Sequence, residues 1–207
     1  MTIPARTAFR SAILAEAAIW PAALIVALLH LVPTQLSPVT DMVSEYALGR
    51  FGLLADTCFL AIGGSALALA VCLRRALQPT PAVKTATIAL TVMATATFAL
   101  PFFPTDPDRP STVHGWIHLI AALLGMTSLI VAAAAIAVHY RTHVATPPPS
   151  THIARLSLMC SAVMALNLAL MLARWLPGLT ERLLILAGMV WIAVISRFLR
   201  TKTLGGG

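Results

Sequence analysis

The sequence predicts an all-α protein, a polytopic integral membrane bundle of six transmembrane helices with both termini in the cytoplasm. Of its 207 residues, 59% are hydrophobic and only 10% are charged. A soluble domain carries about 25% charged residues, and the mean hydropathy here is +0.89. The apolar residues also form stretches of the roughly 20 residues that cross a bilayer. Composition and stretch length together exclude a soluble globular domain.

Six apolar stretches follow one another with short polar connections, at roughly 11–32, 51–73, 84–103, 113–138, 152–176 and 179–199. They occupy nearly the whole chain, so we expect residues 1–207 to form a single membrane domain. The first stretch is longer than the core of a signal peptide, and we expect it to remain as an anchor. Pro21 predicts a kink in this helix, of the kind that a packed bundle tolerates.

The basic residues indicate the orientation of the bundle. With a cytoplasmic N-terminus, the inner side holds Arg6, Arg10, Arg74, Arg75, Lys84, Arg141, Arg155, Arg197, Arg200 and Lys202, and the outer side holds Arg50, Arg109, Arg174 and Arg182. Basic residues concentrate on the cytoplasmic side of membrane proteins. This asymmetry explains the net charge of +7 without nucleic acid. The expected partners are membrane lipids and, as an alternative, other membrane protein subunits.

Residues able to support chemistry gather at the outer end of the predicted bundle. Five of the seven acidic residues lie in outer loops: Asp41, Glu45, Asp106, Asp108 and Glu181. Asp56 lies near the outer end of the second helix, and His30, His114 and His118 lie at a similar depth. This end is therefore where we expect a functional site.

Several of these residues belong to short motifs that follow one another along the chain in a characteristic order. Ser44-Glu45-Tyr46-Ala47-x-Gly49 precedes the second helix, Phe103-Pro104-Thr105-Asp106 precedes His114-Gly115-x-x-His118, and Glu181-Arg182 opens the last helix. The chain resembles the bacterial membrane family catalogued as domain of unknown function 998. The resemblance spans almost the whole chain. It implies a six-helix membrane fold and a bacterial cytoplasmic (inner) membrane location, but it implies no reaction.

The two histidines at positions 114 and 118 are one helical turn apart and share a face of the helix. This spacing offers two imidazoles to one metal ion, and Ser111 or Thr112 is the expected N-cap. A Zn²⁺ site needs further ligands, for which Asp106 and His30 are the first candidates and Asp56 and Glu45 the next. The prediction is a site for Zn²⁺ or another transition metal. The alternatives are structural hydrogen bonds and acid–base chemistry without metal.

The remaining candidates have both functional and structural interpretations. A carboxylate within a membrane helix usually faces a partner or a water-filled cavity. For Asp56 this partner could be Arg174 or His118. Ser44 suits a nucleophile and Glu45 a general base. Otherwise this segment is an interfacial turn whose Tyr46 anchors at the headgroups. Arg182 is either a ligand for a lipid phosphate or an arginine at the membrane edge.

These observations favour a membrane-embedded enzyme with Asp56, Glu45 and Ser44 as catalytic groups. Its chemistry would be metal-dependent hydrolysis or transfer on a lipid-like substrate contacted by Tyr46, Arg174 and Arg182. The first alternative is a non-enzymatic accessory or scaffold subunit of a larger membrane complex. The second is a small proton-coupled transporter that uses Glu16 and Asp56, which requires a polar path between them.

Overall fold

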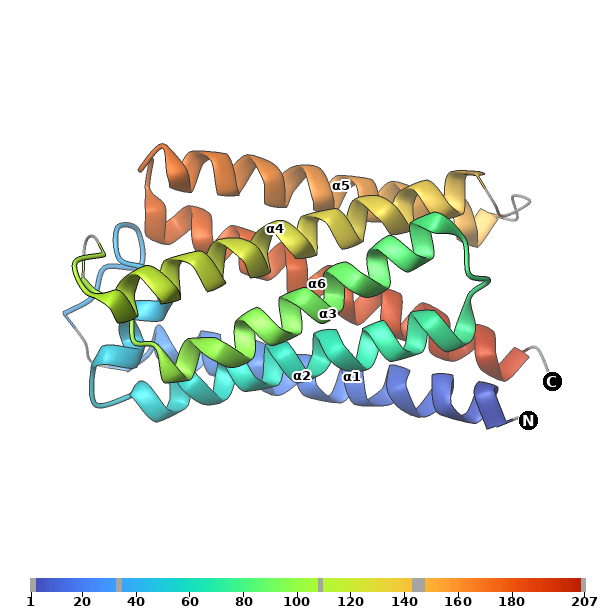
Figure 1. The fold of residues 1–207 in the computed structure, drawn as a ribbon, viewed down its shortest axis with the longest axis horizontal. Coiled ribbons are helices and arrows are strands. Elements are labelled where there is room, and N and C mark those ends of the chain that lie inside the picture. Colours follow the sequence, from blue (N-terminus) through green and yellow to red (C-terminus); the bar gives the residue numbers. More distant parts are fainter. Residues whose placement is uncertain (1–2, 33–34, 108–109, 143–147, 206–207) are drawn as a thin grey trace.

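The structure of this chain is a computed structural model that describes residues 3–32, 35–107, 110–142 and 148–205. Within these ranges it contains helices and no strands. Six α-helices run along the long axis of the molecule, and two short 3-10 helices lie in the connections (Figure 1). Their bounds are α1 Ile3–Leu29, η1 Val43–Leu48, α2 Gly52–Ala76, α3 Pro81–Ala99, η2 Leu100–Phe102, α4 Val113–Thr142, α5 Pro148–Leu172 and α6 Pro177–Gly205.

The helices form an up-and-down bundle. Each long helix packs against its neighbour in sequence, and α6 also packs against α1 and α2, which closes the bundle. All six long helices in the described part of the chain are long and apolar enough to cross a membrane. The predicted all-α fold with six transmembrane helices is therefore confirmed, and the protein is a multi-pass membrane protein.

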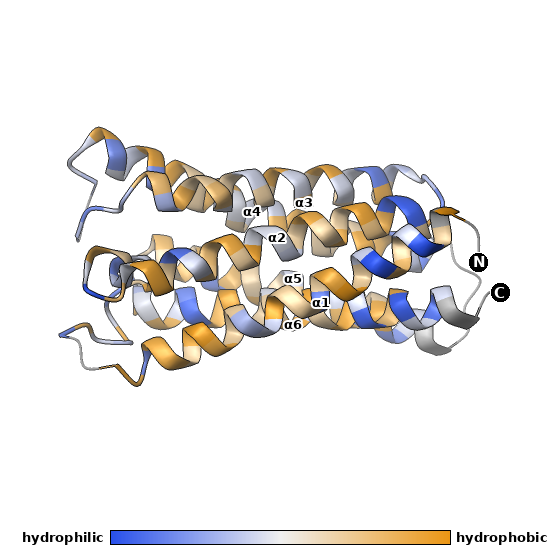
Figure 2. Cartoon of the chain, turned by 90° about the horizontal axis from the view of Figure 1, so that it is seen from below, coloured by the Kyte–Doolittle hydropathy of each residue, from blue (hydrophilic) through white to orange (hydrophobic). Residues whose placement is uncertain are grey.

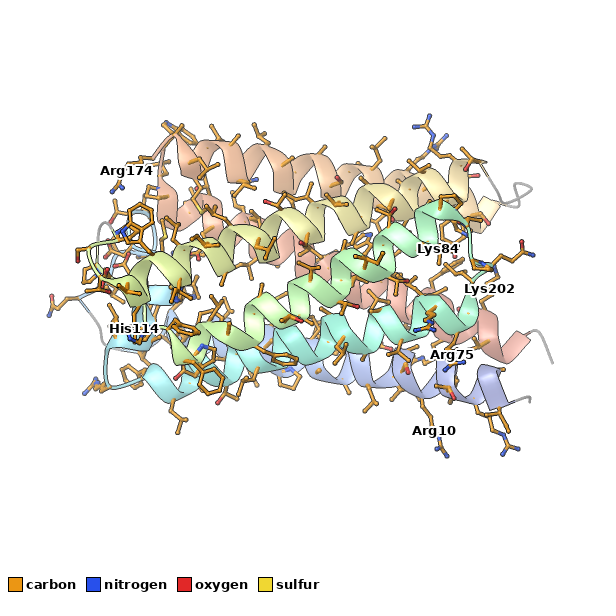
Figure 3. All side chains as sticks on the ribbon, viewed as in Figure 1. Arg10, Arg75, Lys84, His114, Arg174 and Lys202 are labelled. Carbon is orange, nitrogen blue, oxygen red and sulfur yellow. The ribbon has the colours of Figure 1, made fainter. Side chains whose placement is uncertain are left out.

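The two ends of the bundle differ in what they hold. Both chain termini lie at one end, which we call the terminal end, and the connections before α2, α4 and α6 lie at the other, the loop end (Figure 1). Figure 2 shows apolar residues along the middle of the helices and polar residues towards both ends. Arg10, Arg75, Lys84 and Lys202 lie at the terminal end, whereas His114 and Arg174 lie at the loop end (Figure 3).

The apolar stretches predicted the membrane-spanning parts of the helices well but missed some helix ends. The first helix begins at Ile3 rather than near residue 11, and the last continues to Gly205 rather than ending near 199. Hydropathy detects the part of a helix that lies in hydrocarbon, whereas hydrogen bonding continues the same helix through Arg6, Arg10, Arg200 and Lys202. Pro21 lies within α1.

Local chemistry explains two of the helix starts. Thr80 caps α3, because its hydroxyl accepts a hydrogen bond from the N–H of Val83 at 3.3 Å and Pro81 occupies the first helical position, as is typical of helix N-termini. The turn before α6 is tight, with Arg174 at φ 58° and Leu176 at φ 47°. Residues other than glycine rarely adopt this left-handed backbone conformation. Pro177 begins α6 directly after the turn.

The interior is built from small residues and a few side-chain hydrogen bonds. Ala12, Ala15 and Ala22 on α1 are completely buried, and the Ser65 hydroxyl of α2 donates to the carbonyl oxygen of Ala15 at 2.7 Å. Small residues at helix contacts allow such close approach in membranes. Towards the terminal end, the carboxylate of the partly buried Glu16 lies 2.9 Å from Arg200 Nη1 and 3.9 Å from Arg197 Nη1.

Candidate functional site

The connection between α3 and α4 forms one compact unit with the first turns of α4. Both oxygens of Asp106 accept hydrogen bonds, from the N–H groups of Ser111 and Thr112 at 2.6 and 2.7 Å and from the Thr112 hydroxyl at 3.0 Å. These donors lower the pKa of Asp106, with the N–H of Thr112 contributing most. The Thr112 hydroxyl in turn accepts from the N–H of Gly115 at 3.0 Å, so Thr112 is the N-cap of α4.

Gly115 has to be a glycine for this unit to form. A Cβ atom at this position would lie 2.1 Å from Asp106 Oδ2 and 2.5 Å from Asp106 Cγ. The Asp106 carboxylate, which binds the N-cap residue Thr112, thus occupies the space of the missing side chain. This contact explains why the Phe-Pro-Thr-Asp and His-Gly-x-x-His segments occur together, since they fold against each other.

His118 is the histidine that the fold buries, with 4% of its surface exposed. Its Nδ1 lies 2.7 Å from the carbonyl oxygen of Phe103. Because a carbonyl only accepts, Nδ1 carries a proton, and in the neutral ring Nε2 keeps a lone pair. The edge of the ring faces Phe59, and Asp56 lies near enough to His118 for their charges to interact. Of the two partners considered for Asp56, His118 is therefore one that the structure provides.

The other predicted metal ligands lie in different surroundings. His114 is exposed and its ring contacts Phe103. His30 is also exposed, and both of its ring nitrogens are engaged, with Nδ1 2.6 Å from the carbonyl oxygen of Val26 and Nε2 2.6 Å from Arg182 Nε. The described residues contain no group of three or more His, Cys, Asp or Glu side chains that could hold a metal ion. Metal binding remains a prediction without support from this geometry.

Arg182 joins three segments at the loop end, and we call its set of bonds the Arg182 clasp. Its Nη1 donates to the carbonyl oxygens of Asp41 at 2.7 Å and Gly178 at 2.8 Å, and its Nε donates to His30. The guanidinium also lies over the ring of Tyr46, 5.9 Å from its centre. The clasp links α1, the segment before η1 and α6, so the described bonds give Arg182 a structural role.

Tyr46 and Arg174 occupy contrasting positions. Tyr46 is 3% exposed, so its ring packs inside the loop end and does not lie at the surface as a headgroup anchor would. Arg174 is exposed on the α5–α6 turn, and in Figure 3 its side chain lies at the edge of the bundle. Of these two, Arg174 is thus the one that the fold leaves accessible to lipid headgroups.

Glu181 is the buried carboxylate of the loop end, with 5% of its surface exposed. Its Oε2 accepts a hydrogen bond from the N–H of Val43 at 2.5 Å, which fixes the start of η1 against α6. This bond places the buried Ser44 beside α6. Glu45, the next residue, is partly buried and accepts from the N–H of Met42 at 3.2 Å. The sequence placed Glu181 at the outer end of the bundle, at the start of the last helix, but did not identify it as a site residue.

Two neighbouring hollows share some of these residues. The first, which we call the polar pocket, has a volume of about 80 Å³, and its wall holds the polar residues Glu45, Thr105 and Asp106 beside apolar ones such as Leu119, Leu123 and Met171. The second, the inner cavity, also has a volume of about 80 Å³ and is almost entirely apolar. Ser44, His118 and Glu181 line both hollows. The three side chains therefore stand between a hollow with several polar side chains and one that is almost entirely apolar.

The inner cavity extends along the bundle from this boundary to Ile19 and Ile192. Glu181 and Ile192 are about 16 Å apart along α6 at 1.5 Å per residue, about half of the ~30 Å hydrocarbon core of a bilayer. The residues that line the cavity thus span a length similar to the thickness of one leaflet. Helices α1, α2, α3, α4 and α6 contribute to its wall.

Two helical faces with the same spacing form most of this wall. On α4 the lining residues are His118, Ala121, Ala122, Gly125, Met126 and Leu129, and on α6 they are Glu181, Leu184, Ile185, Gly188, Met189 and Ile192. In each helix a polar residue at the loop end is followed at intervals of three and four by apolar residues and a glycine. This shared pattern was the signal in the sequence that could have identified Glu181.

Comparison with known proteins identifies the family but no activity. The sequence model of a family described as "Protein of unknown function (DUF998)" matches residues 15–197. The chain belongs to this family, as the resemblance of its loop-end motifs indicated. No curated protein and no solved structure matches the chain.

Proposed function

We propose that this protein is a membrane-embedded hydrolase or transferase that acts on a lipid-like substrate at the loop end of the bundle. The single observation that carries this proposal is the shared wall of the polar pocket and the inner cavity. An amphiphile has the same division, with a polar head joined to an apolar chain. Its chain would fill the inner cavity, and its head group would lie in the polar pocket beside Ser44, His118 and Glu181.

The residues at the boundary suit general acid–base catalysis. His118 Nε2 would accept the proton of the attacking group, which is water in hydrolysis and the Ser44 hydroxyl or an acceptor alcohol in transfer. As the bond between head and chain breaks, the leaving group would take that proton from His118. Asp56 would stabilise the charged imidazole, and Glu181 would bind a donor group of the head.

The metal-dependent form of this reaction would use His118 as one ligand. A metal ion there would supply a bound water with a lowered pKa. Elemental analysis of protein purified in mild detergent without chelator, beside His114→Ala/His118→Ala, tests this part. Near-stoichiometric metal that is lost in the double variant supports a metal site, and absence of metal from both proteins limits the reaction to acid–base catalysis.

The experiment for the enzyme proposal replaces His118 by Asn and by Ala. The amide of Asn reproduces the Nδ1–H group that donates to Phe103 but lacks Nε2, so His118→Asn keeps the structural bond and removes the base. We expect both variants to lose at least about 100-fold in activity, the lower range for general-base catalysis. The measurement uses 4-nitrophenyl esters of increasing chain length in mixed micelles. If wild type turns over none of them, or His118→Asn retains full activity, this acyl-transfer mechanism is wrong.

A second candidate, an accessory or scaffold subunit, draws support from the Arg182 clasp. The clasp joins three segments of the loop end through hydrogen bonds. Such bonds would hold the loop end rigid, which a docking surface for a partner protein requires. Under this alternative, Arg182→Ala would release a partner protein during purification, and His118→Asn would have no effect. The transporter alternative gains less support, because Glu16 is paired with Arg200 at 2.9 Å and the cavity ends at Ile19 and Ile192.

The distribution of charge supports an orientation for this function. Basic residues collect at the terminal end, where Figure 3 labels Arg10, Arg75, Lys84 and Lys202. By the positive-inside rule this end faces the cytoplasm, so the site would open on the outer side of a bacterial cytoplasmic membrane. Accessibility of a cysteine introduced at Arg174 to a membrane-impermeant maleimide tests this orientation.

A further inference from the structure

A shallow apolar groove follows the seam between α3 and α4 on the outside of the bundle. It consists of two hollows of about 420 and 460 Å³ that share Val92 and Leu124. The groove runs from Ala99 near the loop end to Thr85, and α3 and α4 lie side by side along it in Figures 1 and 2. Because both helices cross the membrane, this lateral groove faces hydrocarbon.

The surface of the groove fits a hydrocarbon chain. Ile88, Ile120 and Leu124 on its sides are 64%, 61% and 49% exposed. Two threonine hydroxyls along the groove are satisfied within α3, since Thr91 donates to the carbonyl oxygen of Thr87 at 2.9 Å and Thr95 to that of Thr91 at 3.0 Å. The groove therefore presents methyl groups to the bilayer, and these two hydroxyls require no further polar partner.

The groove and the inner cavity are separated by a thin wall. Ala121 of α4 lines both of them, and of the small residues on α3, Ala96 lines the groove and Thr97 lines the cavity. A Cβ atom added at Gly125 would lie 3.6 Å from Thr97 Oγ1 and 3.7 Å from Ala96 Cβ, which are ordinary contact distances. At Gly63, in contrast, the added atom would lie 2.8 Å from the ring of Phe98. The α3–α4 seam thus has room for an additional methyl group at the level of the cavity.

We propose that the hydrocarbon chain of an amphiphile enters the inner cavity from the bilayer through this seam, between Ala96 on one side and Ala121 and Gly125 on the other. The occupant is the chain of a lipid from the leaflet at the loop end, because the groove and the cavity are both apolar and meet at that depth. The inference rests on the proposed function in that it takes the cavity as the place of the substrate chain. It assigns the substrate to lipids that reach the site without leaving the membrane.

A disulfide bond across the seam tests this route. The distance of 3.7 Å between Ala96 Cβ and a Cβ at Gly125 matches the mean Cβ separation of about 3.8 Å in disulfides. The double variant Ala96→Cys/Gly125→Cys should therefore lock the seam when oxidised and release it when reduced. The three native cysteines are buried, and mass spectrometry of the oxidised protein verifies which thiols have paired.

The readout is photolabelling of the protein in bilayers by a single-chain alcohol that carries a diazirine near the end of its chain. In the reduced variant we expect labelling of inner-cavity residues such as Met126 and Met189, and at least a fivefold loss of it on oxidation. Groove residues should be labelled equally in both forms. Unchanged cavity labelling after oxidation, or labelling of the groove alone in both forms, would overturn the proposal.

Two controls keep this result separate from the enzyme proposal. The single variants Ala96→Cys and Gly125→Cys should show no effect of oxidant, and Ala121→Val narrows the seam without a crosslink and should slow labelling if the double variant does not fold. Labelling requires no catalysis. If the enzyme proposal fails, ester turnover is absent but the cavity is still labelled. If the lateral route fails, cavity labelling is the same with and without the crosslink.

Discussion

One carboxylate near each end of the bundle is largely shielded from solvent, and the two carboxylates have different partners. At the terminal end, Glu16 on α1 is 2.9 Å from Arg200 Nη1 and 3.9 Å from Arg197 Nη1 on α6. The nearer contact pairs the charges without the alignment of a hydrogen bond. At the loop end, Glu181 accepts the N–H of Val43 and borders the polar pocket and the inner cavity. A carboxylate that is held by cations fastens helices together, whereas one that faces a cavity is available to a ligand.

The largest expected effect on stability is at the loop end, where Gly178 touches the segment that the Arg182 clasp holds. A Cβ atom at Gly178 would lie 2.4 Å from the carbonyl oxygen of Asp41, which is backbone and cannot rotate away. Gly178→Ala should therefore lower the free energy of unfolding by about 1–3 kcal/mol. Gly64→Ala is the matched control, because nothing lies within 4 Å of its added atom. Denaturant titrations in mild detergent would compare them, and equal stability of the two variants would contradict the clasp.

The same substitution at the two carboxylates gives the sharpest form of the comparison. Glu16→Gln removes the charge that pairs with Arg200 and should cost about 1–2 kcal/mol, less than a fully buried pair because Arg200 is partly exposed. Glu181→Gln keeps an oxygen for the N–H of Val43 and should change stability by less than about 1 kcal/mol. Unfolding of both variants is measured side by side with ester turnover. Turnover should fall only in Glu181→Gln, and an equal loss of stability in both would erase the distinction between the ends.

A conservative change at Arg182 separates the geometry of the clasp from its charge. Lysine keeps the positive charge but cannot reproduce the donors that reach His30 and Asp41 together. Arg182→Lys should lower stability by about 1 kcal/mol, and His30→Ala should cost little more once Arg182 is replaced. A double-mutant cycle measures this coupling. Fully additive losses would mean that His30 and Arg182 act separately.

The smallest expected effect is a dependence of the loop end on acid. The pKa of Asp106 is lowered by the N–H groups of Thr112 and Ser111, so its ionised form stabilises the folded state. That contribution is complete above the ordinary pKa of about 3.9 and is lost as the pH falls through the lowered value in the folded protein. Acid unfolding of wild type should therefore show a step below about pH 4 that Asp106→Asn lacks. An identical acid profile for the two proteins would remove Asp106 from the capping unit.

Much of the architecture could be predicted because it follows from local patterns. Apolar length located the six spans, the residue types before α4 narrowed the cap to Ser111 or Thr112, and depth in the membrane gave His118 as one of two candidate partners for Asp56. The site itself depended on contacts between distant segments. His30 bonds to Arg182 and Val43 to Glu181 across more than a hundred residues of chain, and no local pattern states which partner a side chain selects. For the same reason His114 and His118, equivalent by spacing, differ in burial.

The contact between Asp106 and Gly115 also has a consequence for inheritance. Because the carboxylate fills the place of a Cβ atom, neither position can change alone without disturbing the start of α4. Relatives that carry any other residue in place of Gly115 should also have lost the aspartate, and those that keep the aspartate should keep the glycine. We therefore expect the two positions to covary among relatives, so that both residues are kept or both are replaced.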